Sequence, residues 1–544
     1  MPNAQKRKRL LFRAFAIFAG LLPLVLLELA LRLFGVGAEV AIDPLSGFNS
    51  RIPLFEREGA YYRTAKAREP FVGAQEFPAD KSANTVRIFC FGGSTVYGHP
   101  YLSDTAFPKW LELELSARVA SRTFEVINAG GVSYASYRIA PLVKEVMKYQ
   151  PDLIIVATGE NEFLEDRTYR SLKKRSRIHR WVEDRLQSLR IVSVVRDWLH
   201  QRSSKSTQPS GNVEIQTRLD SPGGYASYHR DDRWHDQVAE QFEDSLRDIA
   251  HTCKTRHVPL FLIKLGCNLR DCPPYKSEHR SEISSGDEQA WQRYFDEATA
   301  REKSDPQKAL TEYREAEKID PEYALLLFRI GRLLDTRGEK AEALRYYIRA
   351  RDEDVCPLRM PTRHEEILSW VTIEDSIPLI DAAETITRQS MDQIPGNDWY
   401  LDHVHPNIGG HQLIARALAE RAISLPSLST AKPWADTQRR IVYTRHMQSL
   451  PKSYLADGLK RVEWLEHWAR RERLYDESLP RDGAALVRAG FRHLEIADYE
   501  TAQKEITEGA KMNSVLKSVV EREAELLADQ GRPNTADMVL SWLK

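Results

Sequence analysis

The stretch that decides the fold is residues 85–98, which read TVRIFCFGGSTVYG. Residues 85–91 form an apolar, β-branched run that predicts a buried strand. Gly92 and Gly93 then allow a tight backbone turn, so Ser94 is expected at the carboxyl end of that strand. A serine in this place is a candidate nucleophile, although the same short motif also occurs in turns without catalytic function.

Similar apolar runs follow along the chain and alternate with segments of helical spacing. The runs are residues 124–127, 153–158, 258–264 and, more weakly, 377–381. The helical segments are residues 108–120, 139–148, 238–254 and 408–424. This alternation predicts an α/β fold, a parallel sheet with helices on both faces. Such a sheet binds ligands at the carboxyl ends of its strands, so the residues directly after each run are the candidates for a site.

The length of 544 residues predicts two or three domains. Lys plus Arg and Asp plus Glu each total 78, so the charge balance gives no reason to expect a nucleic-acid partner. The 11 Trp and 21 Tyr are too many for a disordered chain.

The N-terminus has the pattern of a membrane segment. Four basic residues at 6–9 precede an apolar stretch that continues to about residue 37; its uninterrupted part is residues 14–27, and Glu28 and Arg32 lie near one end. We expect residues 1–37 to be an uncleaved anchor and 38–84 a linker. Basic residues before the span place the rest of the chain outside the cytoplasm, in the periplasm or the extracellular space. A cleaved signal peptide and a buried core helix are the alternatives.

Two insertions interrupt the alternating pattern. The first, residues 167–234, is rich in arginine and contains a Ser/Gln/Pro/Gly stretch at 203–212 that is typical of a loop, so it is a candidate lid. The second carries a repeat, because Ala309, Tyr313 and Ala316 recur 34 residues later as Ala343, Tyr347 and Ala350. That period is typical of tetratricopeptide helix pairs.

The repeat predicts an all-α tetratricopeptide-like insertion at residues 291–356 and a looser copy in a C-terminal helical region at 426–544. The small residues that carry it outside the first pairs are Gly331, Gly490, Ala502, Ala510 and Ala536. Such repeats offer a concave surface, so a protein partner and simple bracing of the fold are both open.

The five cysteines are an odd and sparse set. Cys267 and Cys272 are close enough in sequence to close a small disulfide loop in an oxidising compartment, and free buried thiols are the equal alternative. The histidines and cysteines show no zinc spacing. We therefore expect no metal and no cofactor.

Three further segments bring polar residues to the expected sheet edge. Residues 128–136 follow the second run, 158–163 follow the third, and DHVHPN stands downstream at 402–407. An aspartate three residues before a histidine can fix the tautomer of the imidazole while the other ring nitrogen faces a serine. This spacing favours His405, paired with Asp402, over His403.

Together these segments resemble the SGNH (GDSL-like) hydrolase superfamily, whose four blocks centre on Ser, Gly, Asn and His in that order. The resemblance covers most of residues 85–164 and 258–421 apart from the repeats. It implies a flavodoxin-like sheet and a hydrolase domain in two parts, 85–290 and 357–425. It also implies that Ser94 is the nucleophile, Asp402 and His405 its partners, and Asn161 an oxyanion-hole donor.

The chain departs from the family pattern at three places. Gly93 replaces the usual Asp before the serine, and Glu162 replaces the Asp after the block's Asn. The oxyanion glycine falls on Ser133, although Gly131 or Gly130 can serve if the loop shifts. The donor here is a backbone N–H, so Ser133 does not abolish the expected activity.

Other polar residues near the expected sheet edge are alternative candidates for members of the site. His403 is expected to be solvated or structural, and His411 to pack or cap a helix. Arg270 follows the fourth run and can meet an anionic substrate or form a surface ion pair. Glu160 and Glu162 are too close in sequence to act as a glycosidase pair.

These expectations combine into one functional hypothesis. We expect an extracytoplasmic serine esterase, a deacetylase or acylesterase that acts on a small-molecule or glycan acyl ester of the cell envelope. The alternatives are an O-acyltransferase that uses the same triad, and a tetratricopeptide scaffold with a degenerate hydrolase domain.

Overall fold

The computed structural model describes a defined part of the chain. The described residues are 20, 22–34, 52–173, 189–192, 194, 224–428, 431–451, 453–455, 457–458, 460–462, 482–495 and 497–544. They divide into two compact units, one within Met1–Glu56, Arg63–Ala74 and Tyr169–Ile215, the other within Arg57–Tyr62, Gln75–Thr168 and Gln216–Lys544. Most of the predicted lid and parts of the predicted anchor, linker and C-terminal region lie outside the described residues.

The larger unit is built on a five-stranded parallel sheet, which confirms the predicted fold class. Its strands are β4 (Thr85–Gly92), β5 (Thr123–Gly130), β6 (Leu153–Ala157), β7 (Leu260–Lys264) and β8 (Leu379–Asp381). They are ordered β5-β4-β6-β7-β8, the flavodoxin-like arrangement in which the strand order reverses beside the first strand. Each of the five predicted runs is therefore a strand.

The register brings three strand ends to one level. Gly92 at the end of β4 pairs with Gly130 of β5 on one side and with Ala157 of β6 on the other. β5 is longer than the predicted run because residues 128–130 pair with the last residues of β4. The loops after β4, β5 and β6 consequently start side by side.

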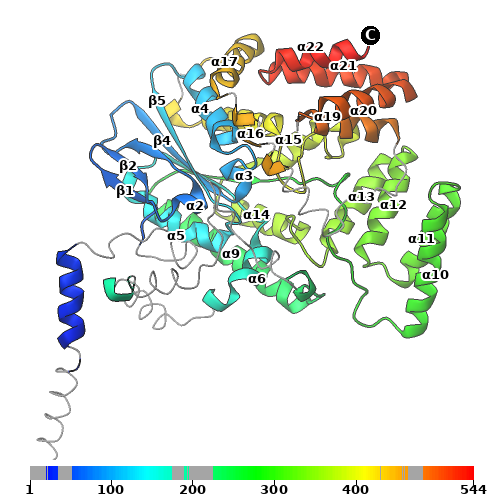
Figure 1. Ribbon diagram of the computed structural model, residues 1–544, viewed down its shortest axis with the longest axis horizontal. Helices are drawn as coiled ribbons and strands as arrows, with labels where there is room; N and C mark the ends of the chain where they lie inside the picture. Colours follow the sequence, from blue (N-terminus) through cyan, green and yellow to red (C-terminus); the bar gives the residue numbers. More distant parts are fainter. Residues whose placement is uncertain are drawn as a thin grey trace, which may run out of the picture. The chain divides into compact units, whose positions relative to one another are not determined.

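Helices cover both faces of the sheet, as Figure 1 shows. One face carries α4 (Phe107–Arg118), α15 (Ala382–Gln389) and α16 (Ile408–Ala422). The other carries α5 (Ser136–Val146), α9 (Asp232–Thr255) and α14 (Thr362–Glu374). β4 and β6 are buried along their whole length, and β6 is entirely apolar because both of its faces are covered. In β4, Ile88 and Cys90 face the core under α4 and α16, while the intervening Phe89 is equally buried.

Two pairs of consecutive, packed helices occupy the region of the predicted repeat. They are α10 (Ser285–Arg301) with α11 (Pro306–Ile319), and α12 (Ala324–Thr336) with α13 (Lys340–Asp352). The repeated alanines and tyrosines all lie in one buried cluster. A Cβ on Gly331 would lie 3.1 Å from the ring of Tyr347, so a small residue is needed where α12 approaches α13. The assignment to the tetratricopeptide family stays a prediction.

The C-terminal region contributes further helices. They are α17 (Asp436–Ser449), α19 (Gly483–Glu495), α20 (Tyr499–Met512), α21 (Ser514–Asp529) and α22 (Pro533–Trp542). α17 is attached to the sheet domain, because Arg439 and Tyr443 both donate to the buried carboxylate of Glu114 on α4, at 2.7 and 2.6 Å.

The remaining elements are short, apart from α6. They are β1 (Phe55–Glu58), β2 (Tyr61–Thr64), β3 (Glu76–Pro78), α2 (Glu69–Val72), α3 (Ser94–Tyr97), α6 (Glu162–Lys173) and the 3₁₀ turns η1 (Ser103–Thr105), η2 (Met147–Tyr149), η4 (Tyr225–Ser227), η5 (Met391–Gln393) and η6 (Pro426–Leu428).

In the smaller unit, residues 22–33 are helical. Glu28 and Arg32, which interrupt the apolar stretch, form an ion pair at 2.8 Å one turn apart. None of the helices within the described residues has the length and apolar character needed to cross a bilayer.

All five cysteines are free and buried. The disulfide between Cys267 and Cys272 that the spacing allowed is therefore not formed.

Arg270 is neither a surface residue nor available to a substrate. It is 2% exposed and donates to both carboxylate oxygens of Asp335 on α12, at 2.6 and 2.7 Å, and to Asp392 at 3.0 Å. Of the two alternatives, the structure shows the ion pair, but it is buried and not on the surface, because Asp335, 65 residues later, occupies the guanidinium. Burial alone would raise the pKa of Asp335, but the hydrogen bonds and charge of Arg270 hold that pKa well below its usual range.

We expect Arg270→Ala to lower the free energy of unfolding by roughly 3 kcal/mol, because it leaves a buried carboxylate short of its main partner. Asp335 has a depressed pKa when folded, so its ion pairs stabilise the fold above the ordinary carboxyl range and less as the pH falls. The gap between parent and variant should therefore narrow on acidification in urea denaturation. Arg388→Ala, in an exposed ion pair with Glu384, is the control and should change little. Equal urea midpoints of unfolding for Arg270→Ala and the parent at neutral pH would contradict a stabilising role of the Arg270–Asp335 ion pair.

Candidate active site

Ser94 stands at the first position of α3, directly after the extended residue Gly93. Its Oγ lies 2.7 Å from Nε2 of His405, a residue 311 positions later in the chain. On its other side the same imidazole places Nδ1 2.6 Å from Oδ2 of Asp402. A carboxylate can only accept, so Nδ1 carries the proton, and Nε2 is left to accept from the serine hydroxyl. The structure therefore brings the three predicted residues into one hydrogen-bonded chain.

Asp402 also shapes the loop that carries His405. Its Oδ1 accepts from the backbone N–H groups of Val404 and His405 at 2.9 and 2.8 Å, which closes the Asp-x-x-His segment into a tight turn. Burial alone would raise the pKa of Asp402, but the neighbouring His405 and His403 hold that pKa well below its usual range. Asp402 is thus a carboxylate at neutral pH.

Asn161 follows β6 and approaches the turn of Ser94 from the neighbouring strand. Its Nδ2 lies 2.2 Å from the place that a Cβ on Gly93 would occupy, and it donates to the carbonyl oxygen of Tyr134 at 3.3 Å. A side chain at position 93 would therefore displace the Asn161 amide.

The backbone N–H groups after β5 differ in whether they already donate a hydrogen bond. Gly131 donates its N–H to the carbonyl oxygen of Gly92 at 2.9 Å, and Gly130 donates to Asn128 at 3.0 Å. Both N–H groups are therefore occupied in this structure, and the role of Gly131 as an oxyanion donor stays a prediction. The N–H of Ser133 has no acceptor in the described part of the chain.

Ser133 has a φ of +60°, the left-handed conformation that favours glycine. In the SGNH pattern that the sequence resembles, a glycine is aligned with position 133. The left-handed backbone at Ser133 is a conformation that such a glycine adopts readily. Ser133 stays the predicted backbone donor of the loop after β5, and its left-handed conformation costs about 1–2 kcal/mol.

Glu162 has a structural role. Its carboxylate accepts from the N–H of Ser136 at 2.8 Å and from the hydroxyl of the same residue at 2.9 Å. It therefore holds the first turn of α5.

His403 and His411 both pack into the protein near the site. His403 is partly buried, with Nδ1 3.4 Å from Asp402 and its ring edge-on to Tyr275, so it is structural and not solvated. His411 is buried within α16, and burial, with a small contribution from His405, lowers its pKa to about 3. The capping of α16 falls instead to Asn407, whose side chain accepts from Gly410.

Two residues next to the site were not predicted. The ring of His99 lies 5.1 Å from the ring of His405, and burial together with His405 lowers its pKa to about 3, so it is neutral. Glu160 is buried beside Gly93. The sequence could have indicated both residues by position, since His99 follows the serine turn and Glu160 directly precedes Asn161.

The C-terminal helices support the loops that carry the site. Arg492 of α19 donates to the carbonyl oxygen of Leu401 at 3.0 Å, and Gln412 of α16 donates to the carbonyl oxygen of Gln530 at 3.0 Å. A Cβ on Gly409 would lie 2.2 Å from the amide of Gln530. The segment around Asp402 is thus enclosed by residues from the end of the chain.

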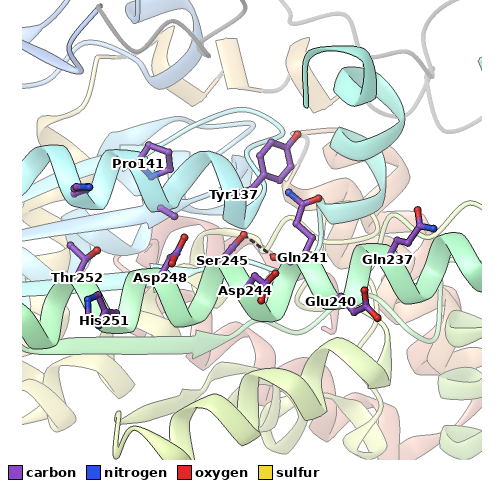
Figure 2. Close-up of a pocket in the computed structure, with 12 residues that line it drawn as sticks. Tyr137, Pro141, Gln237, Glu240, Gln241, Asp244, Ser245, Asp248, His251 and Thr252 are labelled. Atoms are coloured by element: carbon purple, nitrogen blue, oxygen red, sulfur yellow. Dashed lines mark hydrogen bonds between the residues drawn. The ribbon is translucent and has the colours of Figure 1, made fainter. Parts of the chain in front are cut away.

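Ser94 is only 8% exposed, so the reactive cluster is nearly closed. A separate pocket of about 860 Å³ lies between α5 and α9, as Figure 2 shows. It is lined by Tyr137 and by acidic side chains of α9 that include Asp244 and Asp248. None of its lining residues belongs to the Ser94 cluster.

Comparisons with known proteins add only a general likeness. No family model and no curated protein matches the chain. An acetylxylan esterase from Geobacillus stearothermophilus is 12% identical with a TM-score of 0.28, over 63% of this chain and 96% of that protein. A GDSL-like lipase from Bacteroides thetaiotaomicron is 8% identical with a TM-score of 0.25, over 62% of this chain and 88% of its own. An α/β hydrolase enzyme from the metagenome of Lake Arreo, Spain, is 12% identical with a TM-score of 0.28, over 62% and 97%. These values are too low to assign a family or an activity.

We expect Gly93→Ala to fold normally and to react with a fluorophosphonate roughly 100-fold more slowly than the parent, because the new methyl group displaces the Asn161 amide. The measurement is the rate of covalent labelling at Ser94, followed by mass spectrometry. Gly286→Ala is the matched control, since a Cβ there meets only Ser284 Oγ at 3.9 Å. Unchanged labelling of Gly93→Ala would show that Asn161 does not serve the reaction.

Proposed function

We propose that the chain is a serine ester hydrolase. The observation that carries this proposal is the continuous hydrogen-bonded chain Ser94–His405–Asp402, with distances of 2.7 and 2.6 Å. The motif order resembles that of the SGNH superfamily, and the flavodoxin-like sheet is the fold that this resemblance implies.

The first half of the reaction forms an acyl-enzyme. His405 takes the proton of Ser94 as the hydroxyl attacks an ester carbonyl, and the buried carboxylate of Asp402 stabilises the resulting imidazolium. The imidazolium then gives its proton to the departing alkoxide. Asn161 and the N–H of Ser133 receive the negative charge that develops on the carbonyl oxygen, together with the N–H of Ser94 at the start of α3.

The second half regenerates the serine. His405 removes a proton from an incoming water, which attacks the acyl carbonyl, and then returns a proton to Ser94 as the acid leaves. The chain supplies every group that these steps need.

Acyl transfer to a sugar hydroxyl is a second candidate. It uses the same acyl-enzyme and differs only in the acceptor. The low exposure of Ser94 favours it, because an acyl-enzyme that is shielded from bulk water lives long enough to meet an alcohol. A scaffold with a degenerate hydrolase domain is disfavoured by the intact geometry.

We propose a location outside the cytoplasm and an acylated envelope component as the substrate. The support is the order of charge and hydropathy at the N-terminus, with basic residues at 6–9 before the apolar stretch. The helix pairs α10–α13 are proposed to be tetratricopeptide-like and to offer a surface for a protein partner.

The deciding test measures hydrolysis of nitrophenyl acetate by the full chain in detergent. We expect Ser94→Ala and His405→Ala to lower kcat by about 10⁴-fold or more, because each removes a member of the triad. Asn161→Ala should lower kcat by about 10²–10³-fold through the loss of one oxyanion donor.

The exposed residues Ser285 and His251 provide matched controls, and their alanine variants should keep the parent activity. A folded parent chain that neither hydrolyses the ester nor reacts with a fluorophosphonate would refute the esterase proposal. An acetyl group from nitrophenyl acetate that accumulates on Ser94 with slow release to water, and faster release when a sugar alcohol is added, would favour acyl transfer.

A further inference from the structure

Glu160 is a buried acid that the proposed mechanism does not use. It is 3% exposed, and neither of its carboxyl oxygens reaches a hydrogen-bond partner on another residue of the described chain. An ionised carboxylate in such a place is costly unless a cation or several donors accompany it. A buried acid without partners is more stable in its neutral form.

The position of this acid relates it to the reacting atoms. Its Oε1 lies 3.1 Å from the place that a Cβ on Gly93 would occupy, and Nδ2 of Asn161 lies 2.2 Å from the same place. The side chains of Glu160 and Asn161 therefore converge on the residue that immediately precedes Ser94. An aspartate at position 93 would crowd both side chains and bring a second carboxyl beside the first.

The groups that face Glu160 do not neutralise it. Burial is the main cause that raises the pKa of Glu160, to about 7. Its own backbone N–H and His405, from the loop before α16, act to lower that pKa, and the nearby Glu162 acts to raise it. From α14, His364 faces the carbonyl oxygen of Gly159 at 3.4 Å and is neutral, with its pKa lowered to about 3 by burial. No salt bridge to Glu160 is found within the described residues.

We propose that Glu160 is a positioning residue that supports acylation of Ser94 in its protonated form, and that its ionisation weakens the oxyanion site next to Asn161. This inference rests on the proposed esterase function. The oxyanion of the transition state is negative, so a second negative charge a few ångströms behind its donors repels it in a nearly closed site. The neutral acid does not impose that repulsion on the oxyanion.

The test compares the full chain with Glu160→Gln, which is a neutral side chain of the same size. The readouts are the rate of fluorophosphonate labelling and kcat for nitrophenyl acetate across the pH range. In the parent we expect both to fall at high pH as Glu160 ionises. The variant should lack that fall and, at about pH 9, react roughly tenfold faster than the parent, while the two stay alike near pH 6. The change should be in kcat and not in KM.

The controls separate this role from a structural one. Glu240→Gln, at an exposed site on α9, should keep the parent pH profile, and Glu160→Asp should keep the fall at high pH. The inference is overturned if folded Glu160→Gln shows the parent's fall, or if it is slower than the parent at every pH. A folded parent that is no more reactive than Ser94→Ala at any pH would instead refute the esterase function, and the proposed role of Glu160 with it.

Discussion

The carboxylate of Asp402 is the group on which the proposed active site depends. One of its oxygens holds the backbone of the turn and the other holds the imidazole of His405, so a single buried charge fixes both the loop and the proposed base. Because the carboxylate is buried, its contacts are not weakened by water. The imidazole is consequently already oriented toward Ser94, and little reorganisation is left for the moment of reaction.

Much of the fold followed from local patterns. Each predicted apolar run is a strand in the structure, and each predicted helical segment is a helix. The strands were predictable because a strand buried on both faces is mostly apolar, whatever the details of its packing. The meeting of Ser94, Asp402 and His405 could also be predicted, since carboxyl ends of parallel strands share one edge and an Asp-x-x-His turn orients its own imidazole. Their catalytic roles remain a proposal.

The rest depended on contacts between distant segments. Nothing in the sequence near Arg270 shows that Asp335 will occupy its guanidinium, and nothing near Gly131 shows that its N–H will bond to Gly92. The carboxyl group of Glu160 is a further case, because no hydrogen bond joins it to another residue of the described chain. Tertiary packing decides which side chains from distant loops meet. Residue type and spacing along the sequence do not predict these contacts.

The five cysteines are buried and free, and burial raises the pKa of thiols such as Cys90 and Cys272. Their thiolates are scarce and shielded, so the native chain is a poor target for alkylating reagents. Folding also requires no oxidant, and recombinant protein made in a reducing cytosol should have the same covalent structure as protein exported to an oxidising compartment. A single cysteine introduced on the surface could then carry a spectroscopic probe without removal of the native ones.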